Sequence, residues 1–302
     1  MELLSFCLFI GLMVGAILFC FLLIIARGLI PALQPKKPDF LSNKYVEKII
    51  SVIAIIEIAC FAYGYFVEPN LIEVTRLELH SRKIPAGKSF RIVQLSDLHI
   101  ESEGLREEKT PTIVNLQNPD LIILTGDYLN SDTGKPYLAR FLSKLKASDG
   151  IYAVPGNFDS HFKSDDIFEK LGIKMRYADK VNLTINGCPI ALWLNGGLTP
   201  FPDKETYNIC VFHRPDFIPE AAEMGYDLYL CGHTHGGQIR LPFYGAIITL
   251  SKHGKRFEMG HYKEENMDAY VNRGLGMEGG IIPRVRFLAR PEIAVIEVKS
   301  KN

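Results

Sequence analysis

The stretch Gly232-His233-Thr234-His235 places two imidazoles in a glycine-flanked turn, directly after the apolar run at residues 226–231. Short apolar runs rich in branched and aromatic side chains are typical of strands that are covered on both faces of a sheet. In such sheets, ligands bind at the carboxyl ends of the strands. The stretch therefore predicts a buried strand that delivers two nitrogen donors to one end of a sheet.

Four further apolar runs end in the same way, in a side chain that can bind a metal. They are 90–96 before Asp97-Leu98-His99, 119–125 before Gly126-Asp127, 151–155 before Gly156-Asn157, and 207–212 before His213. Carboxylates, imidazoles and an amide oxygen hold divalent first-row metals such as Mn, Fe or Zn. Each donor taken singly is explained by a polar strand end or a hydrogen-bonded core histidine. Seven donors at five strand ends favour a metal site.

Helical patterns alternate with the apolar runs. Between residues 136 and 146, apolar side chains recur at helical spacing and would cover a sheet. A strand at 72–79 leads into the domain, and a second group of strands is expected at 181–185, 188–194, 246–250, 257–261, 269–272 and 293–298. The economical architecture is α/β, with two sheets sandwiched between helices.

The first 67 residues are predicted to form a membrane anchor. Residues 3–26 contain no charged side chain and are long enough to cross ~30 Å of hydrocarbon. No basic residue precedes this run, and it is too long for a signal-peptide core, so we expect it to be retained. A second run, 49–67, carries Glu57, which costs ~2.5–3.5 kcal/mol inside a bilayer. This second run either lies in the interface or spans, and we favour spanning.

The connector between the two runs is basic, which predicts that it lies in the cytoplasm. Its charged residues include Arg27, Lys36, Lys37, Lys44 and Lys48, against Asp39 and Glu47. If both runs span, the catalytic domain is extracytoplasmic, and if only the first spans, that domain is cytoplasmic. We therefore expect an integral protein of the cell (inner) membrane, with an anchor at 1–67 and a catalytic domain at 68–302 whose side stays open.

Composition restricts the partners. The balance of 34 basic and 34 acidic residues provides no basic footprint for nucleic acid, and no protein partner is implied. The cysteines lie in apolar runs or predicted strands, so buried free thiols and a reducing compartment are favoured over disulfides. They are Cys7, Cys20, Cys60, Cys188, Cys210 and Cys231.

The ordered motifs resemble those of the calcineurin-like metallophosphoesterases. Asp97-x-His99, Gly126-Asp127, Gly156-Asn157-x-Asp159, His213 and Gly232-His233-x-His235 follow the order of that family, and the resemblance covers about residues 89–298. It implies the family fold, a four-layer α/β/β/α sandwich of two mixed sheets. It also implies two divalent ions, Mn favoured, that clamp the oxygens of a phosphoryl group and activate a water.

Roles of single residues follow from the same resemblance. Asp97, His99 and His235 would hold the first metal, and Asn157, His213 and His233 the second, with Asp127 as the bridge. Asp127, Asn157 and His233 would also be the catalytic residues. Asp159 is expected to orient its loop rather than to bind a metal.

The membrane-attached front, Gly236-Gly237-Gln238 and Arg273-Gly-Leu-Gly276 are similar to one branch of that family. Some members of that branch hydrolyse UDP-2,3-diacylglucosamine to UMP and a lipid monophosphate during lipid A biosynthesis. The resemblance therefore implies a lipid-linked nucleotide as substrate. The alternatives are a phosphodiesterase or phosphatase for another envelope substrate, and a non-catalytic membrane protein that keeps the fold as a binding platform. A complete set of ligands argues against the platform.

Phe158 departs from the family, which usually has at this position a histidine that protonates the leaving oxygen. Such general acid help is worth ~10²–10⁴-fold, and its loss matters least when a phosphate leaves from an anhydride. Phe158 therefore favours pyrophosphate cleavage. His161 could replace the acid and Arg214 could grip a phosphate, with a surface histidine and a surface salt bridge as the alternatives.

Two further features have open interpretations. Leu241-Pro-Phe-Tyr244 could touch an acyl chain, although packing beneath the histidine loop is favoured. Arg284, Arg286 and Arg290 either face a lipid phosphate or are solvated.

Overall fold

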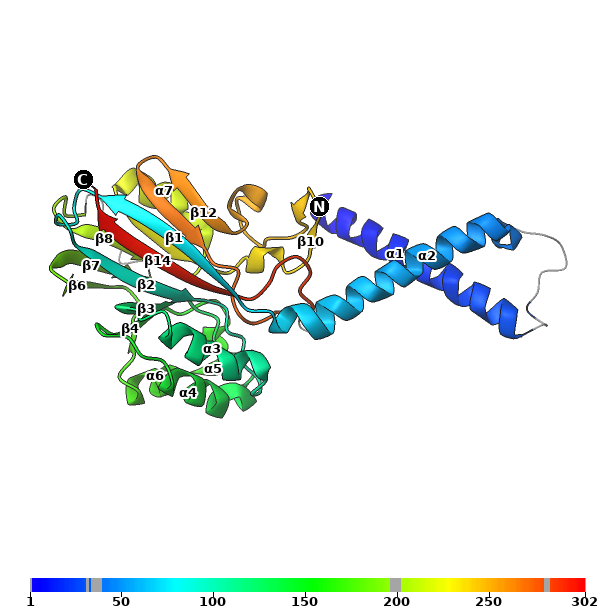
Figure 1. Cartoon of the computed structure of the whole chain (residues 1–302), viewed down its shortest axis with the longest axis horizontal. Coiled ribbons are helices and arrows are strands. Elements are labelled where there is room, and N and C mark those ends of the chain that lie inside the picture. The colour runs from blue at the N-terminus through cyan, green and yellow to red at the C-terminus, as the bar shows by residue number, and fades with distance from the viewer. Residues whose placement is uncertain (1, 31–32, 34–39, 196–201, 280–282, 302) are drawn as a thin grey trace. The chain divides into compact units, whose positions relative to one another are not determined.

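The computed structural model describes residues 2–30, 33, 40–195, 202–279 and 283–301. The chain divides into two compact units, one ending at Val67 and one beginning at Glu68. The first unit contains α1 (Glu2–Leu29) and α2 (Lys44–Ala62), and a π-helical turn, Tyr63–Val67, continues α2 (Figure 1). Lys36, Lys37 and Asp39 of the predicted cytoplasmic connector, and the side chain of Cys7, lie outside the described residues.

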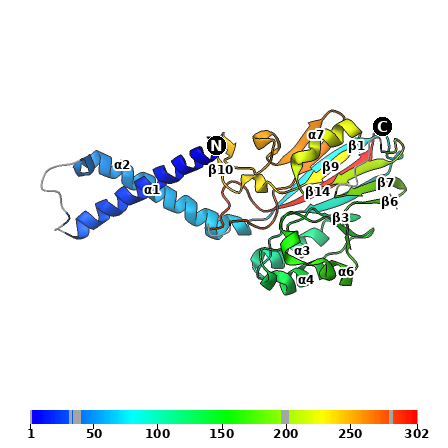
Figure 2. The ribbon, with the colours of Figure 1, turned by 180° about the vertical axis from the view of Figure 1, so that it is seen from behind.

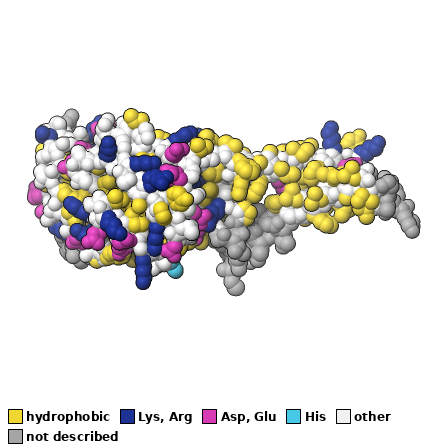
Figure 3. All heavy atoms as spheres, turned by 90° about the horizontal axis from the view of Figure 1, so that it is seen from below, with side chains coloured by type: hydrophobic (Ala, Val, Ile, Leu, Met, Phe, Trp, Pro, Cys, Tyr) yellow, Lys and Arg dark blue, Asp and Glu magenta, His cyan; other side chains and the backbone are white. Residues whose placement is uncertain are grey.

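Among the described residues, one helical segment is long and apolar enough to cross a membrane. It covers Lys44–Asn70, and its most apolar window has a mean hydropathy of 2.1. Asn43 caps its start, because the Asn43 side chain accepts a hydrogen bond from the Tyr45 N–H at 3.0 Å. Large apolar side chains such as Ile49 and Ile56 are exposed along it, and Figure 3 shows hydrophobic side chains over much of the described part of this unit. A helix that is apolar all round requires an apolar environment.

The second unit contains two mixed, six-stranded sheets. The first sheet has the order β1 (Glu73–Ser81), β14 (Glu292–Ser300), β2 (Ser89–Leu95), β3 (Leu121–Leu124), β4 (Ile151–Ala153) and β5 (Lys174–Met175). The second has the order β12 (Gly260–Glu264), β13 (Met267–Val271), β9 (Leu228–Cys231), β8 (Tyr207–Val211), β7 (Cys188–Leu194) and β6 (Asp179–Ile185). The expected α/β fold of two mixed sheets is thus confirmed.

The sheets face each other across an apolar core, and helices cover their outer faces (Figures 1 and 2). Ile92 on β2 packs between the sheets, whereas its neighbour Val93 packs on the helical side, as the two-residue period of a strand requires. The first sheet is covered by α3 (Leu105–Asn115), α4 (Lys135–Ser143) and α6 (Asp165–Lys170), and the second by α7 (Ile218–Met224). A single turn, α5 (Asp159–Phe162), precedes α6.

One predicted strand is wrong, and a second begins three residues later than predicted. Within 246–250, only Ala246 is in a strand, in the two-residue hairpin of β10 (Arg240–Leu241) and β11 (Gly245–Ala246). Leu250 has φ +55°, which no strand can accommodate. Residues 254–257 form a 3₁₀ turn instead of the start of the strand predicted at 257–261, and β12 begins only at Gly260.

Parallel pairing places the ends of the central strands at one level. Leu95, Leu124 and Ala153 pair in register at the ends of β2, β3 and β4, and Val211 pairs with Leu230 near the ends of β8 and β9. The polar residues that follow these strands therefore emerge together. Cys188, Cys210 and Cys231 are buried free thiols on these strands and on β7, as expected.

Candidate metal centre

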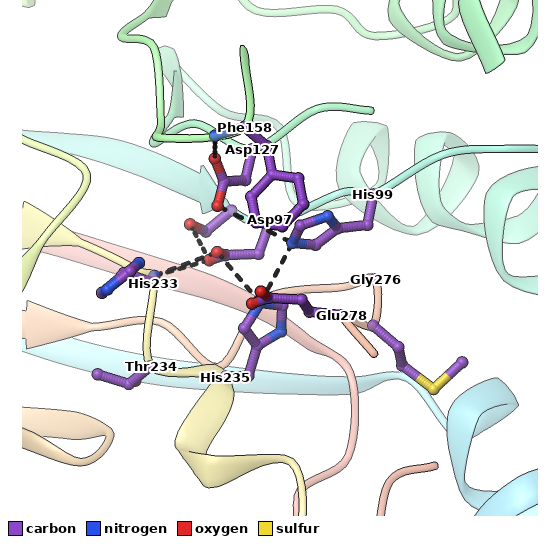
Figure 4. Close-up of polar contacts among 12 residues, drawn as sticks. Asp97, His99, Asp127, Phe158, His233, Thr234, His235, Gly276 and Glu278 are labelled. Carbon is purple, nitrogen blue, oxygen red and sulfur yellow. Dashed lines mark hydrogen bonds and ion pairs between the residues drawn. The ribbon is translucent and has the colours of Figure 1, made fainter. Parts of the chain in front are cut away.

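Asp97, His99 and His235 form the first cluster at this end of the sheets (Figure 4). One potential ligand atom from each lies within 4.8 Å of the others. The Nε2 atoms of His99 and His235 are 3.2 Å apart, and His235 Nε2 is 3.5 Å from Asp97 Oδ1. All three side chains are buried, so bulk water does not separate them.

Asp127, His213 and His233 form the second cluster, again with ligand atoms within 4.8 Å of one another. His213 Nε2 lies 3.1 Å from Asp127 Oδ2, 3.1 Å from His233 Nδ1 and 3.0 Å from Asn157 Oδ1. Asp127 Oδ2 is also 4.0 Å from His99 Nε2 in the first cluster. The Asp127 carboxylate therefore lies between the two clusters.

Hydrogen bonds on the far side of two imidazoles show that these clusters suit cations. His213 Nδ1 is 2.7 Å from the Thr125 carbonyl oxygen, which can only accept, so this nitrogen carries the proton of the neutral ring. His99 Nδ1 lies 2.6 Å from Asn130 Oδ1 in the same way. Both Nε2 atoms then point lone pairs at other lone-pair atoms about 3 Å away. Divalent ions at these positions would relieve that repulsion, so the residues fit a dimetal centre.

The local electrostatics agree with this reading. Burial lowers the pKa of His99 and of His233 to about 4, which keeps both rings neutral and able to bind a metal at pH 7. Burial also lowers the pKa of His213, but the adjacent Asp127 carboxylate outweighs it and raises that pKa to about 9. The negative charge of Asp127 thus favours a positive charge beside it, either a proton on His213 or a bound cation.

The backbone holds most of the predicted ligands in a strained conformation. Left-handed φ values, unfavourable for residues with a Cβ, occur at Asp97 (+48°), His99 (+44°), Asp127 (+56°), His233 (+71°) and His235 (+52°). Ladder-like hydrogen bonds between the strand ends hold this geometry, with the N–H groups of Asp97 and His99 donating to the carbonyls of Gly126 and Asp127. Such strain persists where the surroundings over-determine it, typically at functional sites.

Two motif glycines are required by close contact with the carboxylates. A Cβ at Gly156 would lie 2.1 Å from Asp127 Oδ1, and one at Gly232 would lie 2.2 Å from Asp97 Oδ2. Either substitution would displace the carboxylate. These contacts explain why Asn157 and His233 each follow a glycine.

Asp159 ties the loops after β3 and β4 together. Its carboxylate accepts hydrogen bonds from the N–H groups of Asp127 at 2.8 Å, Tyr128 at 2.9 Å and Gly156 at 2.7 Å. Asp159 thus orients the loop around Asp127.

Phe158 lies over the first cluster, whereas the two candidate substrate residues lie at the periphery. The Phe158 N–H donates to Asp127 Oδ1 at 2.8 Å, and its ring meets the His99 ring edge-on, with centroids 5.2 Å apart (Figure 4). His161 is exposed on α5, and its Nδ1 faces the Phe158 carbonyl at 3.3 Å. Arg214 is 4.0 Å from Asp216, and its charge is one of the causes, after burial and His213, that lower the pKa of His233.

Sequence reasoning missed two residues at the site, Asn130 and Glu278, and assigned the wrong surroundings to a third, Arg286. Asn130 supports His99, three positions after Asp127, a spacing that could have signalled it. Glu278 points toward the clusters in Figure 4, and burial and the Asp127 carboxylate raise its pKa. Arg286 is fully buried and donates to the carbonyls of Arg273, Gly274, Gly276 and Ala289.

Both interpretations offered for Arg286, lipid phosphate or solvent, are therefore wrong. Arg284 forms an ion pair with Glu101, and Arg290 is exposed. The predicted packing of Leu241-Pro-Phe-Tyr244 beneath the histidine loop is also wrong, because Phe243 is fully exposed at the turn between β10 and β11.

Two carboxylate–histidine clusters at the strand ends of a two-sheet α/β fold define a dinuclear metallohydrolase. The chain belongs to the calcineurin-like phosphoesterase family, whose model matches residues 90–237. It is therefore a metal-dependent phosphoester hydrolase.

Three relatives illustrate the range of this family. The chain is 35% identical over 268 residues to the uncharacterized metallophosphoesterase YkuE of Bacillus subtilis (strain 168), covering 80% of this chain and 91% of YkuE. Identity to phosphodiesterase YaeI of Escherichia coli (strain K12) is 28% over 256 residues, covering 79% and 92%. Identity to the UDP-2,3-diacylglucosamine pyrophosphatase LpxG of Chlamydia trachomatis (serovar D) is 25% over 317 residues, covering 82% and 95%. The names of these relatives thus refer to the cleavage of both phosphodiesters and pyrophosphates.

Proposed function

We propose that this protein cleaves a lipid-linked pyrophosphate at a membrane surface, with UDP-2,3-diacylglucosamine as the first substrate to test and UMP and a lipid monophosphate as products. The observation that carries the proposal is a complete ligand set beside Phe158, which has no proton to donate. Similarity to LpxG supports the choice of substrate.

The two clusters would hold two divalent ions. Asp97, His99 and His235 would bind one, and Asn157, His213 and His233 the other, with Asp127 between them. Nitrogen and oxygen donors suit Mn, Fe or Zn, and Mn is favoured. When bound, such ions supply Lewis-acid stabilisation of phosphate oxygens and a water activated at neutral pH.

The remaining residues would position the substrate. The Arg214 guanidinium, close enough to influence His233, has forked donors that match a phosphate. The apolar ring of Phe158, packed against His99, closes one side of the site. The leaving oxygen therefore meets no acid on that side. A phosphate that leaves from an anhydride is stable without that proton, whereas an alkoxide is not.

The first assay supplies the purified protein with Mn²⁺ and UDP-2,3-diacylglucosamine. We expect release of UMP, lost in His235→Ala because that ring faces Asp97 and His99 across about 3 Å. His80→Ala, which removes an exposed imidazole beside Glu78, is the matched control and should retain activity. If the metal-loaded wild-type protein releases no UMP, UDP-2,3-diacylglucosamine is excluded as the substrate.

Phe158→His should restore general acid help. We expect hydrolysis of alkyl and aryl phosphodiesters to rise by up to ~10²-fold, and that of anhydrides to change less. The alkoxide or phenoxide that leaves from a diester needs a proton more than the phosphate that leaves from an anhydride. The comparison is of kcat/KM for both substrate classes in each variant. Phe162→His adds the same imidazole at the end of α5, four positions after Phe158, and serves as control. An equal gain for both classes would exclude the leaving-group explanation.

The apolar helices would confine the enzyme to the surface where a lipid substrate lies. A cytoplasmic UDP-lipid requires the catalytic unit to be cytoplasmic, and a topology reporter fused after Asn302 tests this, since activity in the cytoplasm would support the UDP-lipid. An exterior reporter would mean that both α1 and α2 cross the membrane. The apolar segment Lys44–Asn70 makes that a specific possibility, and the second candidate function, hydrolysis of another envelope phosphodiester or phosphate, would then replace the first.

A further inference from the structure

An apolar cavity of about 420 Å³ opens directly beside the metal centre. His233 and His235 line it, so a molecule in the cavity meets the same two rings that belong to the clusters. Its other walls are mainly aliphatic, contributed by Ile239, Ile247, Ile248, Leu250, Pro283 and Val285. The volume is that of an ordinary small-molecule site.

The cavity is preformed, because hydrogen bonds join its two walls. Gln238 Nε2 donates to the Glu278 carbonyl at 2.8 Å, and the Glu278 N–H donates back to Gln238 Oε1 at 2.7 Å. The N–H of Phe287 donates to the Gln238 carbonyl, and the N–H of Arg240 donates to the Phe287 carbonyl. The segments before β10 and after Glu278 are therefore held apart at a fixed spacing.

The cavity has few polar groups in its lining. Glu278 is the one acidic or basic residue, histidines aside, among the described residues that line it, and Figure 4 places Glu278 beside the clusters. The aliphatic walls provide no partners for a sugar hydroxyl or a base, whose polar groups would be buried at a cost. A hydrocarbon chain loses no hydrogen bonds there and gains from leaving water.

Large apolar side chains are exposed at the cavity and in the hairpin of β10 and β11. Ile248 and Leu250, which line the cavity, are 38% and 61% exposed, and the hairpin exposes Leu241 and Phe243. Exposed apolar side chains beside an apolar cavity favour a contact with apolar matter.

We propose that this cavity binds a hydrocarbon chain of the substrate while the phosphate of the same molecule lies at the metal centre. The inference rests on the proposed function in assuming a lipid substrate. Its basis is that His233 and His235 line the same cavity as the aliphatic side chains. A water-soluble phosphodiester would leave that cavity empty.

The test uses n-alkyl phosphates of two to ten carbons as inhibitors of bis(p-nitrophenyl) phosphate hydrolysis by the Mn²⁺-loaded full chain. The protein is reconstituted in nanodiscs, so that no detergent competes for the cavity. We expect each added methylene to strengthen inhibition by up to about fourfold until the cavity is filled. Protection against thermal unfolding by the same phosphates provides the same comparison without turnover.

Ile248→Asn and Val285→Asn place neutral amides on the two walls and should lower the ratio of decyl to ethyl phosphate affinity at least tenfold. Leu116→Asn, a change at an exposed leucine at the end of α3, should leave that ratio as in wild type. Partition of the alkyl phosphates into the nanodisc bilayer is the same for all variants, so it cancels when their affinity ratios are compared.

Absence of chain-length dependence in wild type, or an unchanged ratio in both cavity variants, would overturn the inference while leaving a metal-dependent hydrolase intact. Chain-length dependence without UMP release would support the binding of a hydrocarbon chain in the cavity and would exclude only UDP-2,3-diacylglucosamine as the substrate.

Discussion

Asp127→Ala lowers kcat/KM for phosphodiester hydrolysis by about 10³-fold or more. The Asp127 carboxylate lies 3.1 Å from His213 Nε2 and 4.0 Å from His99 Nε2, so it is the group that would neutralise ions in both clusters. Its other oxygen accepts the Phe158 N–H, and this bond holds the loop that presents Asn157. Removing the carboxylate should therefore reduce both the bound metal and the rate.

The measurement combines steady-state hydrolysis of bis(p-nitrophenyl) phosphate with metal analysis of the same sample. Asp166→Ala is the matched control, because the exposed Asp166 carboxylate pairs only with Lys170 one turn along α6 among its described ion pairs. We expect that variant to stay within twofold of wild type. Activity of Asp127→Ala within tenfold of wild type, with two ions bound, would contradict the bridging position.

Arg286→Leu destabilises the unit that begins at Glu68 by ~3–5 kcal/mol. The fully buried guanidinium donates hydrogen bonds to the carbonyls of Arg273, Gly276 and Ala289, and leucine would leave these buried acceptors without that donor. The Gly276 N–H in turn donates to the Asp97 carbonyl. We therefore expect a lower unfolding midpoint and weaker metal binding at the first cluster.

Chemical denaturation and metal titration of the same variant provide both quantities. Arg290→Leu removes an exposed guanidinium four positions later and should change the free energy of unfolding by less than about 0.5 kcal/mol. Equal stability of Arg286→Leu and wild type would show that the buried carbonyls find other donors.

The strands and their polar ends are predictable from local sequence. The runs before Asp97, Asp127 and His213 are mainly apolar, as strands buried on both faces require. The glycine before His233 is visible in the sequence, but its reason is tertiary, because a Cβ there would lie 2.2 Å from the Asp97 carboxylate. The apolar runs and their polar ends can be recognised without knowing which strands pair.

Features that depend on distant segments could not be predicted. Residues 246–250 have the composition of a strand, but Leu250 has a left-handed φ and lines the cavity. Arg286 has the same local sequence signal as the exposed Arg290, and only the carbonyls at 273–276 distinguish them. Glu278 approaches the clusters because Gln238, forty positions earlier, holds its backbone.

The sequence by itself determined the family, the order of the donors and the apolar front of the chain, because each depends on residue type at a fixed spacing. Tertiary structure decided which donors meet. His213 meets Asp127 and Asn157, and His235 meets Asp97 and His99, because parallel strands of two different sheets end at one level. The aliphatic cavity beside His233 was likewise decided there, since its walls come from segments that touch only after both sheets have formed.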